Sequence, residues 1–221
     1  MTTPSAETGA AARGRFITFE GGEGSGKSTQ IQMLAERLDR AGVRVIVTRE
    51  PGGSPGAEII RHVLLSGVGK ALGADAETLL FAAARDDHVR SVIEPALKQN
   101  VWVLCDRFID STRVYQGHAA GVDRRLVEAL ERVTIGTLKP DLTFVLDLPV
   151  EVGMRRAAQR RGNEVPDRFE GEALGFHEKL RDGFRRIAAA EPERCVLIDA
   201  MAPPEQVARA IWQALGRRGL V

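Results

Sequence analysis

The sequence predicts an α/β domain built on a five-stranded parallel sheet flanked by helices. Two observations lead to this class. Short apolar runs rich in β-branched residues alternate along the chain with segments of helical spacing. The apolar runs are continuous rather than alternating, as in strands that are covered on both faces. At 221 residues the chain is long enough for one such domain with a full core.

The elements follow from these patterns in chain order. Strands are expected at residues 15–20, 43–48, 101–105, 142–148 and 195–199. The second strand should be buried on both sides, because its apolar run is continuous. Helices are expected at residues 27–41, 57–65, 75–99, 123–135, 149–161, 169–191 and 203–215. The stretch 49–56, rich in proline and glycine, should form a loop, and Pro95 should kink or divide its helix.

Composition limits the possible partners. Lys and Arg number 31 against 30 Asp and Glu, which argues against a nucleic-acid or membrane surface. No apolar run approaches the roughly 18 residues of a membrane helix. Cys105 and Cys195 lie far apart in apolar runs, so we expect reduced thiols in a cytoplasmic protein. Residues 1–14 are expected to be a disordered tail, with a single domain over residues 15–221.

The stretch GGEGSGKST, residues 21–29, organises the rest of the chain. It lies between a strand and a helix and fits the pattern G-x-x-x-x-G-K-[ST]. Its glycines let backbone N–H groups surround a polyphosphate at a helix N-terminus; the alternative, a chance match, is disfavoured by this context. Lys27 should reach the β- and γ-phosphates, and the Ser28 hydroxyl should hold Mg²⁺. The predicted ATP-binding residues are Gly21, Gly22, Glu23, Gly24, Ser25, Gly26, Lys27, Ser28 and Thr29.

Further polar clusters follow the second and third strands, where ligands of open parallel sheets bind. Asp106 should support Mg²⁺ together with Ser28, unless it only caps a turn. Arg49 and Arg107 suit the doubly charged phosphate of a monophosphate; the alternative is structural ion pairing. The chain has no Asn-Lys-x-Asp guanine motif and lacks the repeats of motor ATPases, so a small phosphotransferase fits better.

Five segments together carry a family resemblance. They are the phosphate loop, TREPGG at residues 48–53, LFAAAR at 80–85, the stretch 106–117 with DRF and YQG, and DRFE at 167–170. Over residues 15–215 this combination resembles bacterial thymidylate kinases. The resemblance implies a P-loop NTPase fold of the nucleoside monophosphate kinase type with a lid. It also implies a homodimer that uses ATP and Mg²⁺ to phosphorylate dTMP to dTDP, in dTTP biosynthesis.

The resemblance further implies an acceptor site. Phe81 would stack on thymine, and Arg85, one helical turn later, would donate to a base oxygen. Thr112 would approach the base edge, Tyr115 would exclude a 2′-hydroxyl, and Glu23 would reach the 3′-hydroxyl or a metal-bound water. Judged without the family, Phe81 could be core and Tyr115 a half-buried helix residue. The implied dTMP-binding residues are Glu23, Arg49, Phe81, Arg85, Arg107, Thr112, Tyr115 and Gln116.

Members of this family differ in the source of a catalytic arginine. Residues 22–25 of the phosphate loop include none, so the resemblance implies that the lid, about residues 155–168, supplies it. Arg161 beside Gly162 matches the family position best and Arg160 second, although part of this arginine run could be a solvated face. The implied catalytic residues are Lys27, Asp106, Arg160 and Arg161.

Two alternatives stay open at this point. One is another nucleoside or nucleotide kinase, such as a deoxynucleoside or UMP/CMP kinase; an unphosphorylated acceptor would leave Arg49 and Arg107 without a target. The other is a non-catalytic nucleotide-binding regulator on the same scaffold, against which stand Lys27, Asp106 and the lid arginines.

Overall fold

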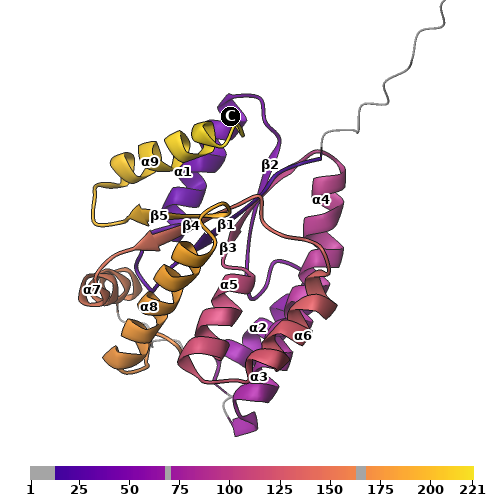
Figure 1. Ribbon diagram of the computed structural model, residues 1–221, viewed down its shortest axis with the longest axis vertical. Coiled ribbons are helices and arrows are strands. Elements are labelled where there is room, and N and C mark those ends of the chain that lie inside the picture. Colours follow the sequence, from indigo (N-terminus) through magenta and orange to yellow (C-terminus); the bar gives the residue numbers. More distant parts are fainter. Residues whose placement is uncertain (1–12, 68–70, 163–167) are drawn as a thin grey trace, which may run out of the picture.

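A five-stranded sheet, parallel throughout, forms the centre of the computed structural model, which describes residues 13–67, 71–162 and 168–221 (Figure 1). The strands run in the order β2-β3-β1-β4-β5. Their bounds are β1 Phe16–Glu20, β2 Val45–Arg49, β3 Trp102–Asp106, β4 Leu142–Asp147 and β5 Cys195–Asp199. The predicted fold class is therefore confirmed.

Helices connect the strands and cover the sheet. The α-helices are α1 Lys27–Arg40, α2 Pro55–Leu65, α3 Ala74–His88, α4 Glu94–Lys98, α5 Ile109–Thr112, α6 Arg124–Ile135, α7 Val150–Arg161, α8 Leu174–Ala190 and α9 Pro204–Arg217. Two π-helical segments, η2 Val89–Ile93 and η3 Arg113–Ala119, continue α3 and α5. Both cysteines are buried and free, as predicted.

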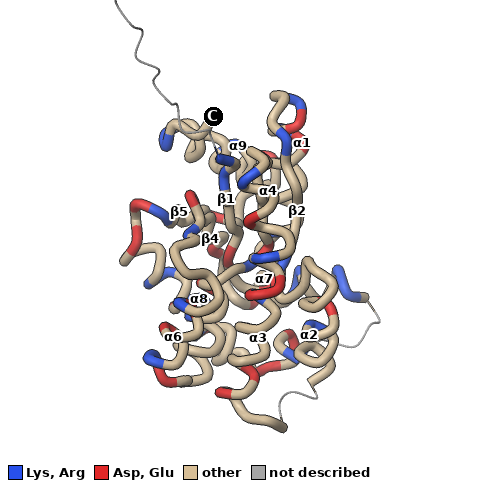
Figure 2. The backbone as a smooth tube through the Cα atoms, turned by 90° about the vertical axis from the view of Figure 1, so that its right-hand side faces the viewer, with Lys and Arg blue, Asp and Glu red and all other residues tan. Residues whose placement is uncertain are grey.

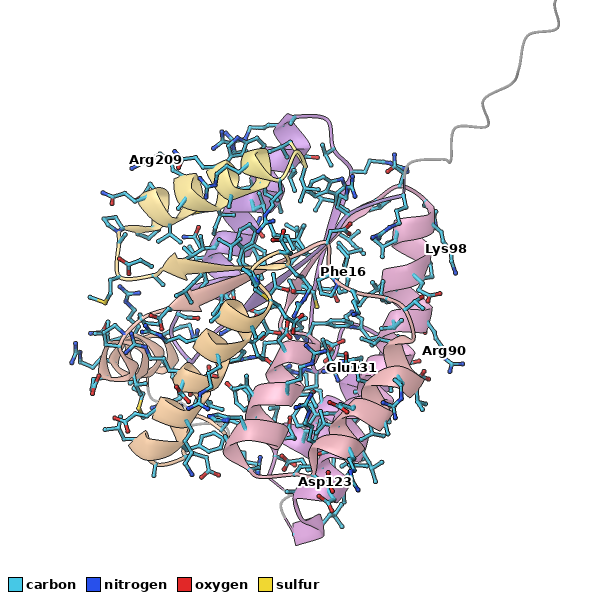
Figure 3. The ribbon with its side chains drawn as sticks, viewed as in Figure 1. Phe16, Arg90, Lys98, Asp123, Glu131 and Arg209 are labelled. Carbon is cyan, nitrogen blue, oxygen red and sulfur yellow. The ribbon has the colours of Figure 1, made fainter. Side chains whose placement is uncertain are left out.

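The core lies on both faces of the sheet, because successive residues of a strand point to opposite faces. Ile17 and Phe19 of β1 pack on one face beneath α1 and α9. Phe16 points to the other face, where its ring meets Phe108 edge-on at 4.8 Å. Figure 3 shows Phe16 at the centre of the molecule, while Arg90 and Lys98 point outward from the helical layer. The strand thus joins two apolar layers.

Acidic and basic residues are interspersed along the described chain, as the coloured backbone of Figure 2 shows. Several of them pair along one helix at i, i+4 spacing, such as Arg90 with Asp86 and Lys98 with Glu94. In the part of the chain that the structure describes, no helix is long and apolar enough to span a membrane.

One strand prediction and one helix prediction were wrong, because both features depend on contacts between segments distant in sequence. The second strand was expected to be buried on both sides, but β2 is an edge strand, and Val47 is 50% exposed. A continuous apolar run does not reveal which strand lies at the edge. The helix expected from residue 169 begins at Leu174, because Phe169 instead packs against Tyr115, with ring centroids 5.4 Å apart.

Two further helical segments differ from a simple amphipathic pattern. The helix predicted over residues 75–99 does divide near Pro95: it passes through η2 and resumes as α4 with the proline in its first turn. Pro95 lacks an N–H and its ring crowds the preceding turn, which favours such a rearrangement. The segment of α5 and η3 was not predicted to be helical, because its polar residues mask any apolar face.

The phosphate loop and α7 approach each other at two glycines. A Cβ atom on Gly153 would lie 2.4 Å from the carbonyl oxygen of Glu23, and a Cβ atom on Gly24 would collide with the Gly153 carbonyl. Gly24 also has a φ of +65°, which side chains rarely adopt. Glycine is therefore needed at both positions for α7 to pack on the loop. The predicted tail lies mainly in residues 1–12 and part of the predicted lid in residues 163–167, both outside the described residues.

Gly153→Ala should consequently destabilise the protein. Because the new methyl group meets backbone rather than a movable side chain, we expect the free energy of unfolding to fall by about 1–3 kcal/mol. Urea unfolding measures this loss. Gly175→Ala is the matched control, since a Cβ atom on that α8 glycine meets nothing within 4 Å. Equal effects of the two substitutions would contradict the close approach.

Candidate active site

The phosphate loop closes on itself through its lysine. Lys27 Nζ donates to the carbonyl oxygens of Gly21 at 3.2 Å and Gly22 at 3.0 Å. Gly26 takes a left-handed φ of 90° and starts α1, so the helix N-terminus faces the loop interior. Burial lowers the pKa of the Lys27 ammonium, and the nearby Arg107 charge lowers it further. The loop thus combines a buried cation with N–H groups, as an anion site requires.

Ser28 and Asp106 meet at the carboxyl edge of the sheet. Ser28 Oγ donates to Asp106 Oδ2 at 2.9 Å, although the two residues come from α1 and β3. Mg²⁺ prefers oxygen ligands and keeps several waters and phosphate oxygens, so a protein needs to supply only one or two. Among the described residues no cluster of three His, Cys, Asp or Glu could hold a metal alone. This oxygen pair fits a nucleotide-bound Mg²⁺.

Arg107 lies between the loop and the rest of the site. Its backbone is left-handed, with a φ of 70°, and its guanidinium donates to Glu23 Oε1 at 2.6 Å and to the Gly21 carbonyl at 3.1 Å. Burial alone would favour the neutral acid of Glu23, but Arg107 and Lys27 outweigh it and lower the Glu23 pKa to about 2. The loop therefore carries an ionised carboxylate beside a buried arginine.

Glu20, which sequence reasoning missed, anchors the segment after β3. This fully buried carboxylate accepts from the Phe108 and Ser111 N–H groups at 2.8 and 3.2 Å and from Ser111 Oγ at 2.7 Å. Burial raises its pKa to about 7, helped by the Asp110 charge and opposed by Ser111, Arg107 and the Phe108 N–H. The sequence signal that could have revealed this role is a glutamate at the end of an otherwise apolar strand.

Aromatic rings gather at the other end of the site. Phe169 lies 6.1 Å from Phe81 and 5.4 Å from Tyr115, measured between ring centroids. Tyr115 donates its hydroxyl to Glu23 Oε1 at 3.3 Å, which connects this end to the phosphate loop. Burial raises the pKa of Tyr115, so its hydroxyl stays a donor. Gln116 Nε2 donates to Glu77 Oε1 at 3.5 Å.

Arg85 is buried, and its guanidinium lies 5.4 Å from the centroid of the Phe108 ring. Its Nε donates to Glu50 Oε2 at 2.8 Å, and its Nη2 donates to Thr112 Oγ1 at 2.9 Å and to the Phe108 carbonyl at 3.3 Å. Arg49, by contrast, has its side chain half-exposed and donates to Glu58 Oε1 at 2.9 Å. Two of the predicted arginines thus sit in very different surroundings.

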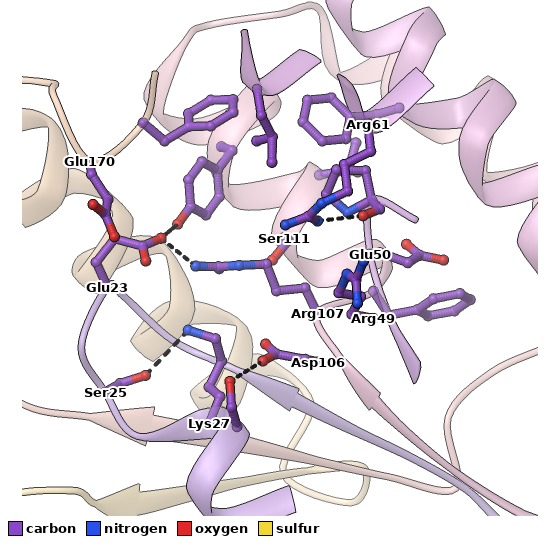
Figure 4. A pocket seen from close by; sticks show the side chains of 18 of the residues that line it. Glu23, Ser25, Lys27, Arg49, Glu50, Arg61, Asp106, Arg107, Ser111 and Glu170 are labelled. Carbon is purple, nitrogen blue, oxygen red and sulfur yellow. Dashed lines mark hydrogen bonds and ion pairs between the residues drawn. The ribbon is translucent and has the colours of Figure 1, made fainter. Parts of the chain in front are cut away.

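One cavity of about 410 Å³ joins these groups (Figure 4). Figure 4 shows Lys27 and Asp106 near one end, Arg107 and Glu23 in the middle, and Arg61 beyond them. Most predicted site residues line this cavity: Glu23, Gly24, Ser25, Gly26, Lys27, Ser28, Thr29, Arg49, Phe81, Arg85, Asp106, Arg107, Thr112, Tyr115, Gln116 and Arg160. Gly21 and Gly22 instead line a small cavity behind the loop.

The two lid arginines differ in position. Arg160 lines the cavity, whereas Arg161 does not, and both donate to Glu170, at 3.2 and 2.7 Å respectively. The cavity also contains residues to which the sequence had assigned no role: Glu50, Pro51, Arg61, Leu65, Phe108, Phe169 and Glu170. Arg61 donates to the Pro51 carbonyl at 2.5 Å. The position of Arg61 on a predicted helix after the 49–56 loop did not indicate that it would line the cavity.

A phosphate loop facing an oxygen pair, with arginines and aromatic rings further along one cavity, defines a P-loop kinase site of the nucleoside monophosphate type. The family model for thymidylate kinase matches residues 19–211. The chain belongs to the thymidylate kinase family.

Individual relatives agree with this assignment. A thymidylate kinase of Nitrobacter winogradskyi is 68% identical over 220 residues, covering 100% of this chain and 94% of the relative. One of Bradyrhizobium diazoefficiens is 68% identical over 206 residues, covering 93% and 90%. The crystal structure of thymidylate kinase from Ehrlichia chaffeensis superposes with a TM-score of 0.73 at 35% identity, over 92% of this chain and 99% of the other.

The Glu20 carboxyl makes stability depend on pH. Its pKa is raised from 4.5 to about 7, so the folded protein binds more protons than the unfolded chain between these values. The stabilisation from this proton is present below about pH 4.5 and is lost as pH rises through about 7. Glu20→Gln should therefore make the free energy of unfolding fall less steeply across this window.

Urea unfolding at several pH values measures the slope. Glu178→Gln, on the exposed face of α8, is the control for losing one carboxylate. A slope unchanged by Glu20→Gln would show that this carboxyl does not hold the proton.

Proposed function

We propose that this cavity binds ATP and dTMP together and transfers the γ-phosphate of ATP to dTMP, giving dTDP and ADP. Membership of the thymidylate kinase family supports this reaction, and the chain is a nucleoside monophosphate kinase by that membership. The observation that carries the proposal is that two sets of residues share one cavity. The phosphate loop lines one part of it, and Phe81, Arg85 and Arg107 line another. No finding favours another acceptor class or a non-catalytic role.

The donor end would be the phosphate loop. Among the described residues, Lys27 donates only to oxygen atoms of the loop itself, and these bonds can be exchanged for bonds to the β- and γ-phosphates. Ser28 and Asp106 would hold Mg²⁺. That ion, when bound, neutralises charge on the β- and γ-phosphate oxygens. Gly24, Ser25, Gly26 and Thr29 would complete the ATP contacts.

The acceptor phosphate would bind between Arg49 and Arg107. Both guanidiniums already pair with carboxylates, Glu58 and Glu23, at 2.9 and 2.6 Å. Two oxygens of the tetrahedral phosphate can accept from a guanidinium in the same bidentate way, and the phosphate carries more charge, so it can compete for them. Freed from Arg107, Glu23 could accept from the sugar 3′-hydroxyl, which keeps the phosphate loop in contact with both substrates.

The thymine would lie against Phe81, near Arg85 and Thr112. An arginine donates only, so it favours carbonyl oxygens over the amino group of cytosine. Tyr115 would pack where a ribose carries its 2′-hydroxyl, and Gln116 would border the base. Transfer then needs positioning and charge stabilisation rather than covalent catalysis.

The catalytic charge of the lid is assigned to an arginine on α7. Arg161 fits the family pattern best, whereas the cavity lining favours Arg160. The homodimer and the cytoplasmic location implied by the sequence stay predictions.

A coupled ADP-release assay with each monophosphate tests the reaction. We expect dTMP to give the highest kcat/KM, with dUMP weaker by about 10–200-fold at most, because one methyl group separates them. Ribonucleotides should react poorly. A preference for UMP, CMP or AMP would contradict the proposed function.

Alanine substitutions distinguish the two lid arginines. Alanine in place of the arginine that contacts the transferring phosphoryl group should lower kcat by up to about 10³–10⁵-fold and change KM for ATP much less. We expect the larger loss for Arg160→Ala. Arg155→Ala, on an exposed position of the same helix, is the matched control. A larger loss for Arg161→Ala would reverse the assignment.

A further inference from the structure

A buried chain of hydrogen bonds runs behind Arg85 and is not used by the proposed reaction. From Arg85 it passes to Glu50 at 2.8 Å, from Glu50 Oε1 to His88 Nδ1 at 3.1 Å, and from His88 Nε2 to Thr48 Oγ1 at 2.7 Å. The side chains of Arg85, Glu50 and His88 are at most 4% exposed. This chain of hydrogen bonds joins the end of β2, the following loop and α3.

The direction of each bond follows from the groups present. The Glu50 carboxylate, paired with Arg85, can only accept, so His88 Nδ1 carries a proton and donates to it. In the neutral ring Nε2 then accepts from the Thr48 hydroxyl. Arg85 and His88 lie at i, i+3 on α3 and thus face the same side of the helix. His88 therefore holds one oxygen of Glu50 while Arg85 takes the other.

Gly53 packs directly against this chain of hydrogen bonds. Its φ is +87°, and a Cβ atom there would collide with both Thr48 Oγ1 and His88 Nε2. The loop backbone thus lies directly on the Thr48–His88 bond. A side chain at this position would displace the histidine, which gives the second glycine of the TREPGG stretch a local reason.

The free donors of Arg85 depend on this arrangement. Its Nε and Nη2 are engaged by Glu50, Thr112 and Phe108, and none of the described residues accepts from Nη1. Because Arg85 lines the cavity, Nη1 is the nitrogen left for a ligand. A flexible arginine has many rotamers, and fixing two of its nitrogens fixes the direction of the third.

We propose that His88 and Glu50 are positioning residues for the acceptor base: His88 orients Glu50, and Glu50 orients Arg85 so that Nη1 faces the bound pyrimidine. The proposal rests on the function proposed above, in which Arg85 donates to a base oxygen. Neither residue touches the substrate in this scheme. Their effect should therefore appear in acceptor binding and not in ATP binding.

Three substitutions of His88 test each bond separately. His88→Leu removes both bonds, His88→Asn keeps a donor where Nδ1 reaches Glu50, and His88→Gln keeps a group where Nε2 reaches Thr48. We expect His88→Leu and His88→Gln to raise KM for dTMP about 5–30-fold, as the loss of a hydrogen bond to a charged group would. His88→Asn should stay close to the wild type. KM for ATP should be unchanged throughout.

A purely structural role predicts a different result. It would lower thermal stability and the active fraction, with no selective rise in KM for dTMP and no rescue by asparagine. Either that pattern or equal KM values for the Leu and Asn variants would overturn the proposal. If His88→Leu does not fold, the Asn and Gln pair decides it alone. His118→Asn is the control, because His118 pairs with Asp182 away from the cavity.

Arg85→Met separates this inference from the function on which it rests. If it raises KM for dTMP while the His88 variants do not, the positioning role is wrong and the dTMP kinase assignment stands. If it leaves KM for dTMP unchanged, Arg85 does not bind the acceptor and the inference falls with that role. A wild-type enzyme inactive on dTMP would overturn the proposed function itself.

Discussion

Charge can be withdrawn from water only when an opposite charge or several hydrogen bonds replace the solvent. The carboxyl edge of this sheet is organised around that requirement. Glu20 at the end of β1 and Glu50 just after β2 are both buried, and each is matched by donors from an element distant in sequence. These carboxylates help to hold the loops that carry the site.

The same requirement applies to the arginines of the site. Arg107 would be costly as a buried, unpaired cation, and Glu23 compensates for it, whereas the half-exposed Arg49 pairs with Glu58 in contact with solvent. In the proposed function, each carboxylate occupies the place that oxygens of the acceptor phosphate would take. Acceptor binding would then exchange one partner of each arginine for another, which would reduce the reorganisation needed. Tyr115, which donates to Glu23, would extend this exchange toward the proposed position of the sugar.

Local pattern was enough to predict the parts of the protein that depend on local chemistry. The phosphate loop lies between its strand and helix as the spacing of Gly21, Gly26 and Lys27 indicates, and Asp106 meets Ser28 because parallel strands end at one edge. The edge position of β2, the start of α8 and the role of Glu20 depend on contacts between distant segments. A single sequence carries no record of these contacts. The partner of Arg85 was missed for the same reason, since Glu50 lies 35 residues away.

The contact between Gly24 and Gly153 has a mechanical consequence. With backbone touching backbone, the first turn of α7 cannot shift without moving the phosphate loop. The far end of the helix is held through side chains instead: Arg156 donates to the Ala200 carbonyl, and Arg160 and Arg161 donate to Glu170. The loop end of α7 is thus held by backbone contact, and its arginine end by hydrogen bonds and ion pairs that can exchange partners.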